Sequence, residues 1–290
     1  MNFINAQQLL ELCESEDITI SCAMVKREIE LQNTDEKAIR DKMQGSYNIM
    51  RNSIKESLEA PLKSMGGLIG GNATKLNDRR NKTATVCGDI VSKAICYAMG
   101  VLEMNASMGL IVASPTAGSS GVIPGTFLAL QEEFELSDDK ILDALLNCSA
   151  IGYLISLNAT VSGAEGGCQA EVGAAAAMAA SGVVEIMGGT PQQCLHAASM
   201  ALSNIMGLIC DPVAGLVEVP CQTRNSMGAS NALISAEMAL SGVEFLVPFD
   251  ETVEAMYKVG CKMPREFRET ALGGIAATKT ARCRGMSCFN

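Results

Sequence analysis

Apolar residues recur at helical spacing along most of this 290-residue chain, and convincing alternating strand patterns are scarce. Ala, Met, Leu and Gly dominate the composition, aromatic residues make up only 4%, and tryptophan is absent. A chain of this length can bury a core without the help of disulfides. We therefore expect an all-α fold, a single domain over residues 1–290, in which closely packed helices are interrupted by glycine-rich loops.

Local signals predict where several helices begin and end. Ser137 precedes two aspartates, which is typical of an N-cap followed by an acidic first turn. Thr190 starts a Thr-Pro-Gln-Gln capping box with proline at the first helical position. Asp250 is expected to cap a helix that ends before Gly260. Further helices are expected over residues 6 to about 60, 90–104 and 225–240.

The charge and composition argue against several classes of protein. The net charge is −10 and basic blocks are absent, which argues against nucleic acid or an anionic membrane as a partner. The start "MNFINAQQLLELCESED" lacks the basic segment and long apolar core of a targeting sequence. The apolar run from Val172 to Val184 is too short to span a bilayer, which needs ~20 residues. Twelve cysteines without signs of secretion indicate reduced thiols and a cytoplasmic location.

Common catalytic and cofactor motifs are missing from the sequence. There is no C-x-x-C, G-x-G-x-x-G, Walker loop or G-x-S-x-G. The one histidine, His196, lies in the middle of an expected helix and is interpreted as a core or surface residue. Any metal site must therefore be built from sulfur and carboxylate.

Three glycine-rich loops with polar side chains interrupt the helical pattern: "SPTAGSSG" from Ser114, "SGAEGGCQAE" from Ser162, and "CDPVAGLVEVPC" from Cys210. Glycine lets the backbone approach a ligand, and chemically equipped loops on a rigid scaffold are typical places for function. Loops that merely connect helices are the alternative interpretation. In "SPTAGSSG" the hydroxyls and backbone amides, close to the start of a helix, suit a carboxylate. The residues expected to hold a substrate acid are Ser114, Thr116, Gly118, Ser119 and Ser120.

The second and third loops carry Cys168, Cys210 and Cys221. Soft thiolates suit zinc or iron–sulfur clusters, but these spacings match neither a zinc finger nor a ferredoxin. A cubane held by three thiolates would leave one iron open, as a Lewis-acid catalyst requires. The three cysteines are therefore the predicted metal ligands.

The motifs "SPTAGSSGVIPG", "SGAEGGCQAEVGAAAAMAA", "GLICDPVAGLVEVPCQTRN" and "ETALGGIAAT" together resemble the α chain of the iron–sulfur-dependent bacterial L-serine dehydratases. The resemblance spans essentially the whole chain. It implies an all-helical catalytic part, a [4Fe–4S] cluster on Cys168, Cys210 and Cys221, no pyridoxal phosphate, and conversion of L-serine to pyruvate and ammonia. Because the sequence begins with the α part, a separate β chain is implied, and we expect an oligomer.

The roles of other residues stay open at this point. The sequence does not identify the base that removes the substrate proton; the candidates are Lys63, Lys75, Glu165 and Glu171, or a residue of the β chain. Glu165 and Glu171 flank Cys168, and the alternative is that they only orient its loop through hydrogen bonds. Arg224 and Asn225 either bind substrate or brace the cysteine loop. Where related chains continue Pro-Thr-Gly, this one ends in a tail with Cys283 and Cys288. A tail thiolate that reached the fourth iron would cap it without substrate, whereas an unstructured tail would leave it open.

Two other classes of protein are compatible with these patterns. A redox or electron-transfer iron–sulfur protein would hold a fully ligated cluster and would not turn over an amino acid. A thiol-rich helical scaffold would bind the β chain and no metal. Within the enzyme reading, threonine or cysteine could replace serine as substrate, because one methyl group discriminates by only ~1–3 kcal/mol.

Overall fold

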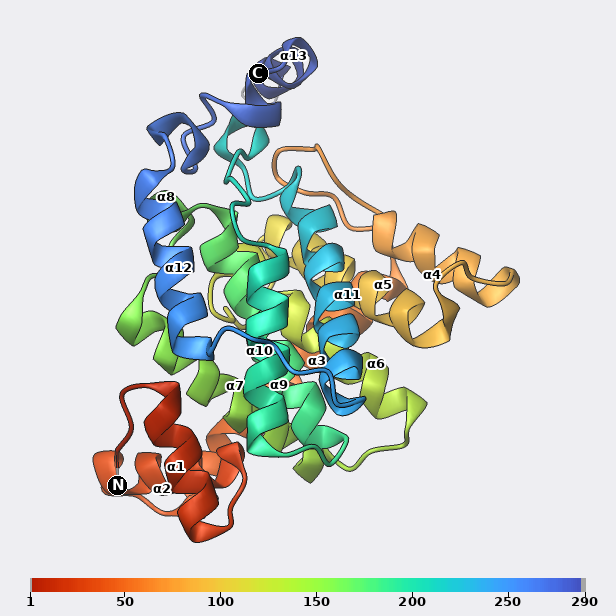
Figure 1. Cartoon of the computed structure of the whole chain (residues 1–290). Helices are drawn as coiled ribbons and strands as arrows, with labels where there is room; N and C mark the ends of the chain where they lie inside the picture. The colour runs from red at the N-terminus through yellow and green to blue at the C-terminus, as the bar shows by residue number, and fades with distance from the viewer. Residues whose placement is uncertain (1, 288–290) are drawn as a thin grey trace.

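The computed structural model describes residues 2–287, and it confirms the predicted all-α class (Figure 1). Within that range the only β pairing is an isolated bridge between Cys210 and Arg268. The helices are α1 (Ala6–Glu16), α2 (Ile20–Gln32), α3 (Glu36–Glu59), α4 (Asn72–Lys82), α5 (Gly88–Ala106), α6 (Val122–Glu133), α7 (Asp138–Asn158), α8 (Gly163–Gly166), α9 (Ala174–Ile186), α10 (Pro191–Asn204), α11 (Cys221–Leu240), α12 (Phe249–Lys262) and α13 (Lys279–Ser287).

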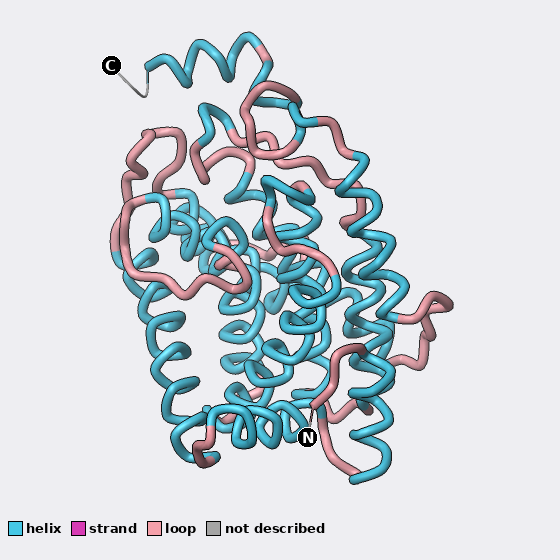
Figure 2. Tube along the Cα trace, turned by 90° about the vertical axis from the view of Figure 1, so that its left-hand side faces the viewer, coloured by secondary structure: helices cyan, strands magenta, loops and turns pink. Residues whose placement is uncertain are grey.

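Helix α9 forms the centre of the bundle. All but one of its residues are buried, and it packs against α6, α7, α10 and α11. Its sequence is rich in alanine, so the surrounding helices can approach its backbone closely. Figure 2 shows most of the long helices running in a similar direction, while many of the connecting loops gather at one end. Packing around an alanine-rich centre therefore leaves that end for the loops that carry the site.

Contact between α5 and α6 shows how tightly the bundle is packed. A Cβ placed on Gly125 of α6 would lie 2.7 Å from the backbone nitrogen of Ala98 on α5. Only glycine fits at such a backbone-to-backbone contact. The glycines of this chain thus serve helix packing as well as loops.

The predicted capping signals are partly confirmed. The hydroxyl of Ser137 accepts from the N–H of Lys140 at 3.4 Å, and Thr190 forms a complete capping box with Gln193. The prediction for Asp250 is wrong: α12 begins at Phe249 and continues past Gly260 to Lys262, and the Asp250 carboxylate instead accepts from the N–H of Ala6 at 2.8 Å. This carboxylate caps α1, which is distant in the sequence, so tertiary packing overrides the local signal.

The helical stretch expected from residue 6 to about 60 consists of three helices. Asp17 ends α1 with φ 52°, and Asn33 ends α2 with φ 50°. Asp and Asn tolerate this left-handed conformation better than most residues, so each can end a helix without glycine. A periodicity that continues through such residues therefore hides the helix ends.

Among the described residues, α7 is the one helix that is long and apolar enough to cross a membrane. Within the apolar window, 67% of this helix is buried inside the fold. A core helix passes the same test of length and composition, so the burial of α7 accounts for its apolar character.

Candidate active site

The fold brings together the three cysteines that the sequence singled out. Cys168 immediately precedes a π-helical turn, Gln169–Gly173, that leads into α9; Cys221 is the first residue of α11. Cys210 lies after α10 and is anchored on both sides of the bridge: its N–H donates to the carbonyl of Phe267 at 2.8 Å, and its carbonyl accepts from Glu269 at 2.8 Å. All three side chains are buried, with 3%, 3% and 8% of each residue exposed.

The side chains of Cys168 and Cys210 lie close enough for each to shift the pKa of the other. The interaction with Cys210 lowers the pKa of Cys168, and the interaction with Cys168 raises the pKa of Cys210. Burial raises the pKa of Cys221 to about 12, and the charge of Cys168 adds to this effect. The three thiols therefore lie within electrostatic range of one another.

The three thiols have the donor chemistry of an iron–sulfur cluster, although the structure does not arrange them around a single metal ion. In the part of the chain that the structure describes, no group of three or more His, Cys, Asp or Glu side chains is arranged to hold a metal ion. Three buried sulfurs with one nearby guanidinium are nevertheless a soft donor set, which thiophilic metals prefer.

Arg224 ties the cysteine segments to one another. One guanidinium nitrogen donates to Asp211 Oδ1 at 2.7 Å, and another donates to the carbonyl of Ile209 at 2.9 Å. The positive charge of the same side chain adds to the lowering of the Cys168 pKa. Asp211 in turn accepts from the N–H of Ile275 at 2.7 Å. Arg224 therefore braces the segment from Cys210 to Cys221, which we call the cysteine loop. The sequence left open whether Arg224 binds substrate or braces this loop, and the structure supports bracing.

Glu171 is the carboxylate that faces the thiols. It belongs to the π-helical turn, accepts from the hydroxyl of Thr116 at 2.8 Å, and lies 3.7 Å from Cys210 Sγ. Burial raises the pKa of Glu171 above its ordinary value. A Cβ on Gly163 would lie 2.4 Å from Glu171 Oε2, so that glycine makes room for the carboxylate. Glu171 therefore links the second loop to both of the others.

The other three candidates for the base lie away from this group. Lys63 and Lys75 are exposed, and Lys75 Nζ lies 3.4 Å from Asn72 Oδ1. Glu165 is exposed as well and accepts from the hydroxyl of Thr160. Glu171 is thus the one of the four that the fold places in contact with the cysteines.

The loop from Ser114 to Gly121, which we call the serine-threonine loop, contains a short 3-10 turn, Ala117–Ser119. The Ser120 hydroxyl donates to the carbonyl of Ala117 at 2.8 Å, and Ser119 is hydrogen bonded to Thr116 at 3.2 Å. These hydroxyls therefore shape the loop itself. The hydroxyl of Ser114 is different, because it is buried and has no hydrogen-bond partner in the described structure. A buried unpaired hydroxyl is unfavourable unless something else satisfies it, so Ser114 is the loop residue that is ready to meet a ligand.

Asn225 connects the serine-threonine loop to α11, the helix that begins at Cys221 and that we call the cysteine helix. Its Oδ1 accepts from the N–H of Gly121 at 3.0 Å, and its Nδ2 donates to the carbonyl of Gly118 at 2.7 Å and to that of Cys221 at 2.9 Å. Asn225 is fully buried. The structure thus gives Asn225 the bracing role as well.

Sequence reasoning missed Glu218, which lies inside the cysteine loop. Its carboxylate accepts from the Ser64 hydroxyl at 2.7 Å, from the N–H of Gly66 at 2.7 Å and from that of Leu68 at 2.9 Å. Glu218 is 2% exposed. A single acid in the apolar run "GLVEVP" was the available signal, because a buried charge needs such partners.

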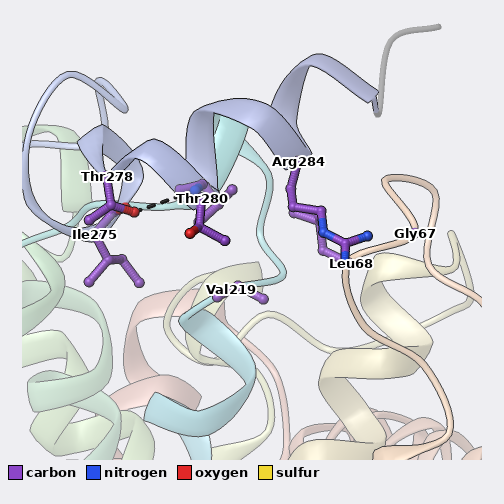
Figure 3. Close-up of a pocket in the computed structure, with 9 residues that line it drawn as sticks. Gly67, Leu68, Val219, Ile275, Thr278, Thr280 and Arg284 are labelled. Carbon is purple, nitrogen blue, oxygen red and sulfur yellow. Dashed lines mark hydrogen bonds between the residues drawn. The ribbon is translucent and has the colours of Figure 1, made fainter.

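A cavity of about 490 Å³ lies against the outer side of the cysteine loop (Figure 3). Val213 and Val219 of that loop, the glycine-rich segment at Gly67 and the start of α13 form its walls. The predicted site residues are not among those that line it. Cys283 of the tail is exposed on α13, and Cys288 lies outside the described residues, so the idea of a capping tail thiolate stays a prediction.

Comparison with known proteins identifies the family of this chain. The model of the family described as "Serine dehydratase alpha chain" matches residues 15–276. The chain is 44% identical to a probable L-serine dehydratase, alpha chain, of Bacillus subtilis, over 97% of this chain and 93% of the relative. It is 44% identical to the L-serine dehydratase, alpha chain, of Peptoniphilus asaccharolyticus, over 95% and 94%. It is also 38% identical to an L-serine dehydratase of Helicobacter pylori, over 97% of this chain but only 62% of that protein. This chain belongs to the serine dehydratase alpha chain family.

Proposed function

We propose that this chain is the catalytic α subunit of an L-serine dehydratase, which converts L-serine to pyruvate and ammonia. The observation that carries the proposal is that Glu171 contacts both Cys210 and Thr116, and so connects the buried cysteines to the loop with the unpaired Ser114 hydroxyl. The names of the relatives supply the substrate. One hydrophobic core that extends from Phe3 to Met256 supports a single catalytic domain over residues 1–290.

In this proposal, Cys168, Cys210 and Cys221 hold a [4Fe–4S] cluster, and pyridoxal phosphate is not used. When bound, the cluster supplies a Lewis-acidic iron that polarises the substrate's oxygen atoms. Arg224 keeps Cys168 and the Cys210–Asp211 segment together, which fixes the direction of two of the three ligands.

The serine-threonine loop binds the substrate carboxylate. Ser114 donates the hydrogen bond that it makes to no protein atom, and the loop backbone around Gly118 approaches the ligand closely. Thr116, Ser119 and Ser120 keep the loop in shape through their own bonds, and Thr116 also orients Glu171. The loop therefore acts as a preformed cradle.

Glu171 is the proposed proton acceptor. It would take the Cα proton of serine and return it to the departing hydroxyl group, which leaves as water and gives 2-aminoacrylate. That product becomes an imine, and hydrolysis of the imine releases pyruvate and ammonia. Thr116 holds Glu171 at 2.8 Å, so the carboxylate is fixed before the substrate arrives.

A separate β chain and an oligomeric enzyme are part of the proposal, because the two relatives with matching length are named alpha chains. We place the enzyme in the cytoplasm. The eleven cysteines that the structure describes are free thiols. Reduced thiols are the usual state of cysteines in the cytoplasm.

The test is anaerobic purification of the chain and of its Cys168→Ser, Cys210→Ser and Cys221→Ser variants, with Cys261→Ser as an exposed control. Bound iron and sulfide, visible absorbance, and pyruvate from L-serine are measured on the same samples. We expect iron and turnover in the wild type and in the control, and loss of both in the three site variants.

Two outcomes would contradict the proposal. A wild-type chain that stays colourless after anaerobic reconstitution would exclude the metal site and favour a metal-free scaffold. A chain that holds iron but turns over no hydroxy amino acid, with or without the β chain, would favour the redox protein.

A further inference from the structure

Three large apolar side chains stand exposed beside the candidate active site. Met65, Met108 and Leu110 are 72%, 77% and 70% exposed. Single exposed apolar residues are normal on a protein surface, whereas a contiguous group of them marks an interaction site. We call these three residues the methionine rim.

The rim is one surface, because hydrogen bonds join its two segments. The N–H of Met65 donates to the carbonyl of Ala106 at 2.8 Å, and the hydroxyl of Ser107 donates to the carbonyl of Lys63 at 3.0 Å. Residues 63–65 therefore lie against the end of α5, directly beside Met108. The backbone therefore places the three residues in adjoining segments.

Met108 occupies an unusual backbone position. Its φ is 62°, in the left-handed region after the end of α5, where glycine is the common residue. A methionine there is unfavourable both for its backbone and for its exposed side chain. Such outliers are found at functional sites, where the side chain itself is needed.

The rim is continuous with the site on two sides. Asn105, just before Met108, donates to the carbonyl of Ala117 in the serine-threonine loop at 3.5 Å. Ser64, next to Met65, donates to Glu218 of the cysteine loop at 2.7 Å. In Figure 1 the segment before α4 lies at the same end of the bundle as the loop that leads into α11. A partner on the rim would therefore touch both site loops.

We propose that the methionine rim is the docking surface for the companion β chain, an inference that rests on the proposed function. The chain covers 62% of the Helicobacter pylori dehydratase, so the remaining 38% of that protein lies outside the match. In that relative the remainder is part of the same polypeptide. The two relatives that this chain matches over more than 90% of their length are named alpha chains, so the unit that corresponds to this remainder is the partner to be placed.

The chemistry of the rim defines its partner. Two methionines and a leucine offer a soft apolar centre that adapts its shape to a facing surface. Lys63 is exposed beside them, which favours a carboxylate at the edge of the partner's apolar face. A standard interface buries ~800 Å² on each side, so these residues would form its energetic centre and the glycine-rich loops its border.

The experiment uses the full α chain and the polypeptide from the same organism that matches the remaining 38% of the Helicobacter pylori protein. The rim variant is Met65→Glu with Leu110→Glu, which leaves the left-handed Met108 unchanged. The control is Leu246→Glu, because Leu246 is 95% exposed in the loop between α11 and α12, away from the rim (Figure 1). Affinity is measured anaerobically by calorimetry, and iron per chain is measured on the same samples.

We expect the rim variant to keep its iron and to bind the companion at least about tenfold more weakly, while the control binds like the wild type. Equal binding by the wild type and the rim variant would overturn the proposal. Loss of self-association with unchanged companion binding would also overturn it, because a second copy of the chain would then occupy the rim. A wild type that binds the companion but holds no iron would contradict the proposed function and leave the docking surface supported.

Discussion

Replacing Asn225 with aspartate tests whether hydrogen bonds fasten the serine-threonine loop to the cysteine helix. The substitution changes almost no volume. It keeps the oxygen that accepts from Gly121 and removes the Nδ2 group that donates to the carbonyls of Gly118 and Cys221. Any effect on stability therefore reports on the two donated bonds and on the new carboxyl group.

The expected loss follows from what each carbonyl retains. Cys221 is the first residue of α11, so its carbonyl keeps a helical partner, and losing the extra bond costs ~1 kcal/mol. The carbonyl of Gly118 loses a 2.7 Å bond beside a fully buried side chain, which costs about 1–3 kcal/mol. The free energy of unfolding should fall by about 2–4 kcal/mol at pH 8.

The pH dependence provides a second measurement. Burial raises the pKa of a carboxyl group, so the new aspartate is protonated in the folded chain at a pH where it is ionised in the unfolded chain. A protonated carboxyl can donate to Gly118 again. Its contribution to stability is therefore present at low pH and is lost as the pH rises through the folded pKa.

The assay is anaerobic urea unfolding of the wild type and the variant at pH 5.5 and pH 8, with Asn48→Asp on the exposed side of α3 as the control. The control should stay within ~0.5 kcal/mol of the wild type. A loss below ~0.5 kcal/mol at pH 8, or a larger loss at pH 5.5 than at pH 8, would refute the reasoning.

Two further predictions concern the packing around the site and a buried carboxylate far from it. Gly274→Ala puts a Cβ 2.0 Å from Asp211 Oδ2 at a φ of 58°, so unfolding free energy should fall by about 2.5–5 kcal/mol, from a left-handed alanine and a lost charged hydrogen bond. Gly67→Ala, at φ 67° with open space around it, should show only the left-handed cost of ~1–2 kcal/mol in the same urea assay; equal losses would contradict this account. Glu185 has its pKa raised by burial, so the folded chain binds the extra proton and stability falls as the pH rises from about 4.5 through the raised pKa. In thermal unfolding, the stability of Glu185→Gln relative to the wild type should therefore rise between pH 4.5 and pH 8. A stability difference that stays constant across that range would contradict the raised pKa of Glu185.

Features of the fold that depend on residues close together in the sequence could be predicted, whereas features that depend on distant residues could not. The all-α class and the start of α7 and α10 follow from helical periodicity and from caps such as Ser137 and Thr190, which act within four residues. The start of α11 was placed four residues late, because Cys221 opens the helix without a side-chain cap. The loop around Cys168 proved largely helical, with a π-helical turn that no local pattern indicated.

The sequence by itself determined the type of elements, the residues with unusual chemistry and the family to which they belong. Only the tertiary structure decided which of these residues meet. Cys168, Cys210 and Cys221 are far apart in the chain and come together because the ends of α9, α10 and α11 pack side by side. The same packing places Glu171 against Thr116 and Cys210 and turns Asp250 toward a helix more than 240 residues away. Periodicity and capping depend on neighbours in the sequence, whereas a site depends on contacts that exist only after the helices have packed.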